Sequence, residues 1–67
     1  MIEVVWKRCR AGLLEAYIVK DGKHRLVGFV LDRFYRLADE IPIREASSET
    51  AAQLALVEEY NKKGVPA

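Results

Sequence analysis

The first half of the chain alternates between apolar segments and turn signals. Three segments of similar length are rich in β-branched and aromatic residues, which favour β-strands. They comprise residues 2–10, 13–20 and 23–31. Ala11-Gly12 and Asp21-Gly22 separate them, and Asp-Gly is a strong hairpin signal because both central residues of a type I′ turn need a positive φ angle. The pattern predicts a three-stranded antiparallel β-meander.

After Leu31 the spacing of the apolar residues changes. They now recur at the i, i+3, i+4 and i+7 positions of a helix, as Phe34, Leu37, Ala38 and Ile41. Asp32 is placed to cap such a helix, so we predict a short helix at about 33–40. The alternative is a fourth strand over residues 34–43, which Pro42 would confine to the edge of the sheet.

Residues 48–63 carry the clearest helical pattern in the chain. Ser47 or Ser48 can serve as the N-cap, and Gly64 supplies a C-terminal stop. The apolar side of this helix consists of Ala52, Leu56, Val57 and Tyr60. The chain is 51% hydrophobic with a net charge of +1, which is typical of a folded rather than a disordered protein. We therefore predict a single small α+β domain over residues 1–67, with the C-terminal helix packed on the sheet.

The predicted sheet is apolar on both faces. Two-residue loops at both turns would place Trp6 opposite Tyr17 and Arg8 opposite Glu15. Because side chains alternate across a sheet, one face would carry Val5, Cys9, Leu14, Ala16, Ile18, Val27, Phe29 and Leu31. The other would carry Val4, Trp6, Leu13, Tyr17, Val19, Leu26 and Val30. The helix can cover only the first face, so we expect the second to be covered by residues 32–43, by a second copy in a two-fold dimer, or by a different partner.

This second face is the predicted interaction site. Its candidate partner-binding residues are Trp6, Arg8, Arg10, Tyr17 and Leu26. Residues 1–36 contain eight Lys and Arg against four acids, whereas residues 37–67 contain three against six, so the sheet should have a basic rim. We predict a small non-enzymatic interaction or regulatory protein, a homodimer that binds a protein partner through its aromatic sheet face.

The same region allows a second interpretation, a nucleic-acid-binding module. The basic residues that would contact phosphates are Arg8, Arg10, Lys20, Lys23 and Arg25. Trp6 and Tyr17 would supply the aromatic surfaces on which single-stranded bases stack. The sequence pI of 7.9 argues against this interpretation, because strong nucleic-acid-binding domains tend to have a pI above about 9.

The sequence predicts no catalytic, cofactor-binding or metal-binding residues, and we do not expect an enzyme. His24 is the only histidine, and no carboxylate is placed to make it a general base. Cys9 is the only cysteine, so no internal disulfide is expected; Lys7 and Arg8 beside it could lower its thiol pKa, but we predict a small buried residue. No apolar run reaches about 18 residues and no signal-peptide pattern is present, so we expect a cytoplasmic protein with no membrane partner.

Overall fold

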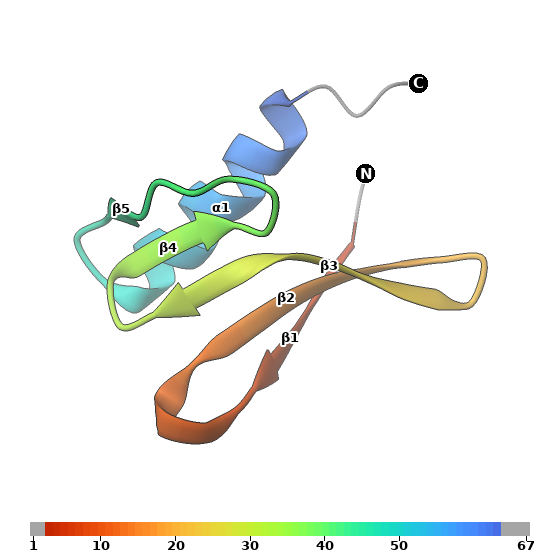
Figure 1. Cartoon of the computed structure of the whole chain (residues 1–67), viewed down its shortest axis with the longest axis horizontal. Coiled ribbons are helices and arrows are strands. Elements are labelled where there is room, and N and C mark those ends of the chain that lie inside the picture. The colour runs from red at the N-terminus through yellow and green to blue at the C-terminus, as the bar shows by residue number, and fades with distance from the viewer. Residues whose placement is uncertain (1–2, 64–67) are drawn as a thin grey trace.

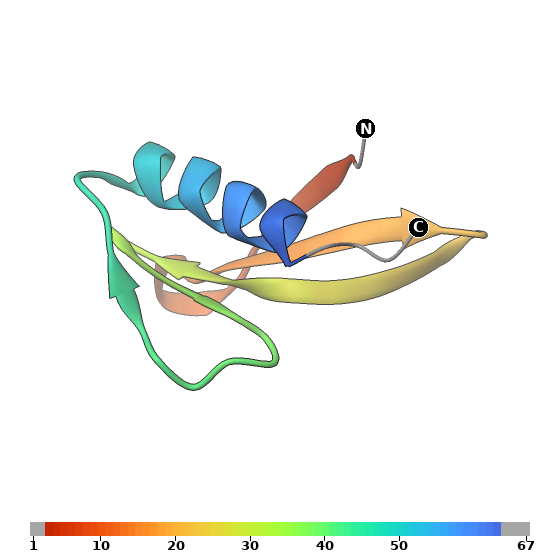
Figure 2. The same cartoon turned by 90° about the horizontal axis from the view of Figure 1, so that it is seen from above.

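Residues 3–63 form a five-stranded antiparallel sheet with one helix packed on one side (Figures 1 and 2). The computed structural model describes residues 3–63, so Ile2 of the first predicted strand and the predicted helix stop Gly64 lie outside it. The elements are β1 Val4–Arg8, a 3₁₀ turn at Arg10–Gly12, β2 Leu14–Lys20, β3 Lys23–Leu31, β4 Phe34–Leu37, β5 Arg44–Glu45 and α1 Glu49–Lys62. The strands lie in the sheet in the order in which they occur along the chain. The predicted α+β class and the first three strands are thereby confirmed, β4 corresponds to the alternative of a fourth strand, and β5 was not predicted.

The short helix predicted at about 33–40 is wrong. Asp32 does not cap a helix but adopts a positive φ of 56° in a tight turn, after which the chain pairs back along β3 as β4. Tyr35 and Leu37 face the helix side of the sheet, which is the two-residue period of a strand. The alternative of a fourth strand identified the right type of element but not its length, because β4 ends at Leu37 and Pro42 lies in the following connection.

The C-terminal helix α1 is confirmed within one residue of its predicted ends. The Ser48 hydroxyl accepts a hydrogen bond from the backbone N–H of Ala51 at 3.1 Å, which satisfies one of the free N–H groups at the helix start. Ala52 and Leu56 of this helix are completely buried against the sheet. The core consists of Leu14, Ala16, Ile18, Val27, Val30, Leu37, Ala52 and Leu56.

The first connection of the meander is longer than the sequence indicated. It is a three-residue loop in which the Cys9 N–H donates to the Leu13 carbonyl at 2.7 Å, and Ala11 and Gly12 have φ angles of 59° and 78°. Compared with the predicted two-residue loop, the extra residue shifts the pairing of β1 with β2 by one position. The predicted register is therefore wrong here: Trp6 lies opposite Ala16 rather than Tyr17.

The second connection has the predicted form, but the strands that it joins are irregular. Asp21 and Gly22 have φ angles of 53° and 74°, as a type I′ turn requires. The expected pairing holds from this turn as far as Tyr17 opposite Leu26, and there a β-bulge leaves Val27 without a partner in β2, although its carbonyl accepts a hydrogen bond from the Ala38 N–H at 2.8 Å. Beyond the bulge the register differs by one residue from the predicted one.

These two shifts redistribute the residues between the faces of the sheet. Val4, Trp6 and Val30 lie on the helix side instead of the exposed side. Val5, Phe29 and Leu31 move the other way, to the side that we call the outer face. The outer face carries Val5, Lys7, Glu15, Tyr17, Val19, His24, Leu26, Phe29, Leu31, Phe34, Arg36 and Glu45.

Candidate functional site

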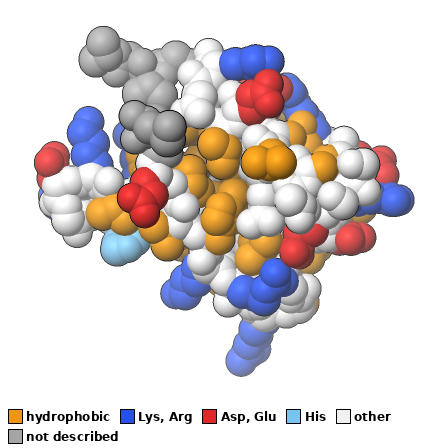
Figure 3. All heavy atoms as spheres, turned by 180° about the vertical axis from the view of Figure 1, so that it is seen from behind, with side chains coloured by type: hydrophobic (Ala, Val, Ile, Leu, Met, Phe, Trp, Pro, Cys, Tyr) orange, Lys and Arg blue, Asp and Glu red, His pale blue; other side chains and the backbone are white. Residues whose placement is uncertain are grey.

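The outer face of the sheet is open across the part of the chain that the structure describes. α1 lies on the opposite side, and the connection between β4 and β5 swings away from the helix before the chain returns to it (Figure 2). Viewed from the helix side, apolar side chains gather in the middle and charged side chains surround them (Figure 3). Within residues 3–63 no helix covers the outer face, although seven of its twelve residues are apolar or aromatic.

A groove of about 650 Å³ lies on this face over β3 and β4. Its lining residues are Leu13, Phe29, Leu31, Phe34, Tyr35, Arg36 and Ile43. Phe34 is 39% exposed, Leu31 48% and Ile43 68%, which is unusual for large apolar side chains that lie next to one another. The volume falls within the range of sites that bind small molecules or anchor side chains of a partner. We call these seven residues the outer groove.

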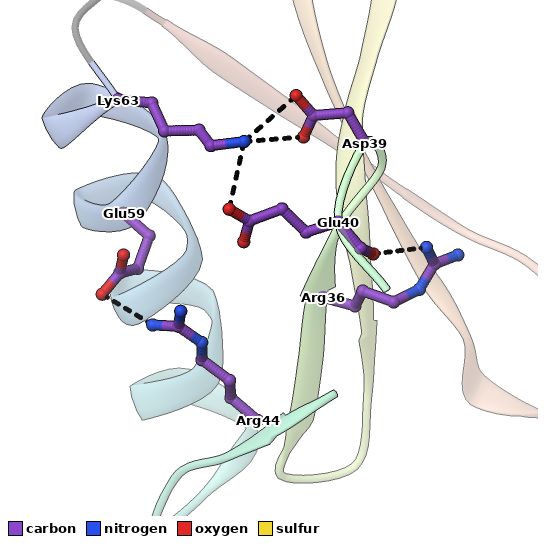
Figure 4. A network of polar contacts seen from close by, with 6 residues as sticks. All are labelled: Arg36, Asp39, Glu40, Arg44, Glu59 and Lys63. Carbon is purple, nitrogen blue, oxygen red and sulfur yellow. Dashed lines mark hydrogen bonds and ion pairs between the residues drawn. The ribbon is translucent and has the colours of Figure 1, made fainter. Parts of the chain in front are cut away.

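Arg36 is the only charged residue that lines the outer groove. Its guanidinium lies 5.1 Å from the ring centre of Phe29, a cation–π arrangement, and donates to the Glu40 carbonyl at 2.8 Å (Figure 4). No carboxylate in residues 3–63 forms an ion pair with it. The neighbouring Arg33 differs, since it pairs with Glu45 at 2.7 Å. Arg36 therefore leaves an uncompensated positive charge beside an apolar surface.

A polar network fixes the chain segment that forms one wall of the groove. Lys63 lies 3.1 Å from both Asp39 and Glu40, and Arg44 pairs with Glu59 at 3.2 Å (Figure 4). Hydrogen bonding to Lys63 lowers the pKa of Asp39, and the Glu40 and Asp39 carboxylates raise the pKa of Lys63. These pairs connect both ends of the β4–β5 connection to α1. They hold in place the segment that carries Ile43.

The structure divides the predicted partner site between the two sides of the sheet. Trp6 is half-buried against the core on the helix side, and Arg8 on the same side pairs with Glu49 at 3.2 Å. Tyr17 and Leu26 lie opposite one another on the outer face. Arg10 belongs to the 3₁₀ turn. The five residues therefore do not form one surface. The first loop has three residues instead of two, and this places the side chains of β1 on the opposite faces from those predicted.

The basic residues proposed for nucleic acid lie in separate regions of the molecule. Lys20, Lys23 and Arg25 are exposed around the end of the β2–β3 hairpin, which extends beyond the last pairs made by β1 and β4 (Figure 1). Arg8 is engaged with α1, and Trp6 faces the other side of the sheet from Tyr17. Trp6 shares the helix side with Lys20, Lys23 and Arg25 but is half-buried against the core, and Tyr17 lies on the outer face, so the two predicted stacking residues do not act together.

Cys9 and Tyr17 meet at Glu15, next to the first connection. The Tyr17 hydroxyl donates to the Glu15 carboxylate at 2.9 Å, which lowers the pKa of Glu15. The Glu15 carboxylate in turn raises the pKa of the Cys9 thiol, which is half-buried rather than fully buried as predicted. A raised thiol pKa is the opposite of what a nucleophile needs at neutral pH. Tyr17 also contacts His24 edge to face, with ring centres 6.2 Å apart.

Two other kinds of site are absent from residues 3–63. No group of three His, Cys, Asp or Glu side chains is arranged to hold a metal ion there. None of the helices in this stretch has the length and apolar character needed to cross a membrane.

Sequence reasoning missed the outer groove for two reasons. Phe29 and Leu31 were assigned to the core because the bulge was not foreseen, and Phe34 was placed on a helix. A signal for the β3–β4 turn was present in the sequence, since Asp32 follows one apolar segment and precedes another. The comparison with known proteins adds nothing to this site, because no family model, curated protein or solved structure matches the chain.

Proposed function

We propose that this is a small non-enzymatic interaction protein that binds a protein partner through the outer groove. The partner segment that fits has apolar side chains and an acidic residue. The apolar lining would bury the former, and the Arg36 guanidinium, which has no ion-pair partner among residues 3–63, would bind the latter. The uncompensated charge of Arg36 beside exposed Phe34 and Leu31 is the observation that carries this proposal.

The composition of the groove supports a protein ligand. Aromatic residues and arginine are enriched at the energetic centres of protein interfaces, and lysine and glutamate are depleted there. The groove contains Phe29, Phe34 and Arg36 of the outer face, and its lining residues include no lysine or glutamate. The proposed site thus combines aromatic residues with one arginine, and it lies over β3 and β4 instead of around Trp6 and Arg8 of β1.

Nucleic-acid binding remains the alternative, with weaker support. The exposed cations at the hairpin end favour it, whereas the separation of Trp6 from Tyr17 removes the predicted stacking platform. A surface with few cations also contributes little counterion release.

The proposal can be tested with two short peptides, one in which leucine and phenylalanine alternate with glutamate and one with lysine in place of glutamate. Binding is followed by the amide chemical shifts of the isotopically labelled protein. We expect the glutamate peptide to shift the signals of Phe29, Phe34 and Arg36, and the lysine peptide to shift them much less.

Two matched variants locate the site. Phe34→Ser should remove binding of the glutamate peptide, whereas Val19→Ser, at an exposed apolar position of the outer face away from the groove, should leave it unchanged. Absence of binding by either peptide, or equal loss in both variants, would contradict the proposal.

A further inference from the structure

β1 is an open edge of the sheet. It pairs with β2 on one side only, and no other strand in residues 3–63 pairs with its second side. The opposite edge is formed by β5, which has only two residues, whereas β1 has five. A free edge of this length presents a row of unpaired backbone groups that can accept another strand.

The hydrogen bonding of the first connection shows which groups face this edge. The Cys9 N–H donates to Leu13, so the backbone groups of Cys9 point toward β2. Because the direction alternates along an antiparallel strand, Lys7 and Val5 point the same way. The N–H and C=O groups of Val4, Trp6 and Arg8 therefore point outward, and they are the groups available to a new strand.

The charges along β1 are arranged so that an antiparallel copy is complementary. Directly opposite residues in an antiparallel pair lie on the same face of the sheet. In a two-fold pair of identical strands this allows registers centred on Val4, Val5 or Trp6. Only the register centred on Val5 places Glu3 of one copy opposite Lys7 of the second copy, and it does so twice. Neither Glu3 nor Lys7 has an ion-pair partner within residues 3–63.

We propose that two copies of this chain associate through β1, antiparallel and centred on Val5. The five strands of each copy then form one continuous sheet with both helices on the same side. A hollow of about 490 Å³ beside β1, lined by Val5, Trp6, Lys7, Tyr17 and His24, would receive side chains of the second copy. This pairing leaves the outer groove free, so it does not depend on the function proposed above.

Cysteine cross-linking tests the register directly. In a Cys9→Ser background, Val5→Cys places two thiols opposite one another at the two-fold axis, where the expected Cα separation of about 4.5 Å permits a disulfide. Lys7→Cys is the matched control, on the same strand and face, with the two cysteines about 13 Å apart. We expect mild oxidation to yield a covalent dimer with Val5→Cys and almost none with Lys7→Cys. Equal cross-linking of the two variants would overturn the proposal.

Charge reversal provides an independent test by light scattering. Glu3→Lys and Lys7→Glu should each weaken the dimer by about tenfold, because each change places two like-charged pairs across the interface. The double variant should recover the original affinity, although within each copy the carboxylate introduced at position 7 still lies opposite Glu15.

Lys20→Glu, which alters the net charge equally at the hairpin end, should have no effect on association. A protein that stays monomeric up to about millimolar concentration, far above the affinity range of ordinary complexes, or a double variant that does not recover, would refute the β1 interface.

Discussion

Leu56 of α1 rests directly on the backbone of Gly28 in β3. A Cβ atom at position 28 would lie 2.7 Å from Leu56 Cδ1 and 2.5 Å from the Arg36 carbonyl oxygen of the adjacent strand. Both distances are shorter than atoms in contact allow, so the absence of a side chain lets the helix and β4 approach β3 at the same point. Gly28 is therefore required by packing, since its φ angle is not in the left-handed region.

We expect Gly28→Ala to destabilise the protein by about 1–3 kcal/mol, the usual cost of overpacking a core. The backbone contact with Arg36 cannot relax by a simple change of rotamer. Urea unfolding followed by circular dichroism measures the difference. Val19→Ala, at an exposed strand position, serves as the control and should change stability by less than about 0.5 kcal/mol. Equal stability of Gly28→Ala and the original protein would show that the helix does not approach the sheet this closely.

The reactivity of Cys9 should be limited by Glu15. Because the neighbouring carboxylate raises the pKa of the thiol, alkylation by iodoacetamide near pH 8 should be slower than that of a free cysteine. Glu15→Gln removes the negative charge, so it should lower the thiol pKa and increase the rate. Tyr17→Phe is the control, since it removes the hydroxyl and keeps the carboxylate. An unchanged rate in Glu15→Gln would exclude this control of the thiol.

The Asp39–Lys63 pair predicts a specific pH dependence. The pKa of Asp39 is lowered by Lys63, so the pair stabilises the folded state above the ordinary carboxyl pKa of about 4, and this contribution is lost as pH falls through the lowered value. The pKa of Lys63 is raised, so at the alkaline end the contribution is present below about pH 10 and is lost as pH rises further.

Lys63→Met should move the pKa of Asp39 upward, toward that of an exposed aspartate. The side-chain carboxyl signals of the labelled protein report this value directly during an NMR titration. Lys62→Met provides the control, because Lys62 pairs with Glu58 on the helix and not with Asp39. If the pKa of Asp39 is the same in both variants, Lys63 does not fix the β4–β5 connection.

Nucleic acid should bind weakly, if at all, and only at low salt. The exposed cations Lys20, Lys23 and Arg25 give only a small positive patch, and Trp6 on their side of the sheet is half-buried against the core. We expect no mobility shift of single-stranded or duplex DNA at about 0.15 M salt, and loss of any low-salt binding in the double variant Lys20→Glu, Lys23→Glu. Tight binding that persists at this salt concentration would favour the nucleic-acid alternative over a protein partner.

The local elements of this fold follow from short-range signals. The Asp21-Gly22 turn and the cap at Ser48 each depend on the conformation or hydrogen bonding of one or two residues, and both are found where the sequence places them. The strand register, in contrast, does not follow from such short-range signals. Whether the first loop contains two or three residues decides which side Trp6 faces, yet Ala11-Gly12 is compatible with either length.

The residues that line the outer groove are not those predicted for the partner site. An exposed aromatic sheet face with nearby cations was expected, and such a face exists, but Phe29, Phe34 and Arg36 form its groove instead of Trp6 and Arg8. Both faces of the sheet carry apolar residues. The hydrophobic pattern alone therefore fits the correct register and a register shifted by one residue equally well. The pairing was decided by tertiary contacts such as that of Leu56 with Gly28, which no local pattern encodes.

Val27, which has no partner in β2, marks the point where the register between β2 and β3 shifts by one residue. Residues on the hairpin side of it take their orientation from the tight turn, and residues up to Leu31 take theirs from the neighbouring strands. If a related sequence moved this irregularity along the strand, inward and outward positions would be exchanged only over the stretch it crossed. Such a displacement offers a stepwise route for remodelling the docking surface while the hairpin and the helix stay as they are.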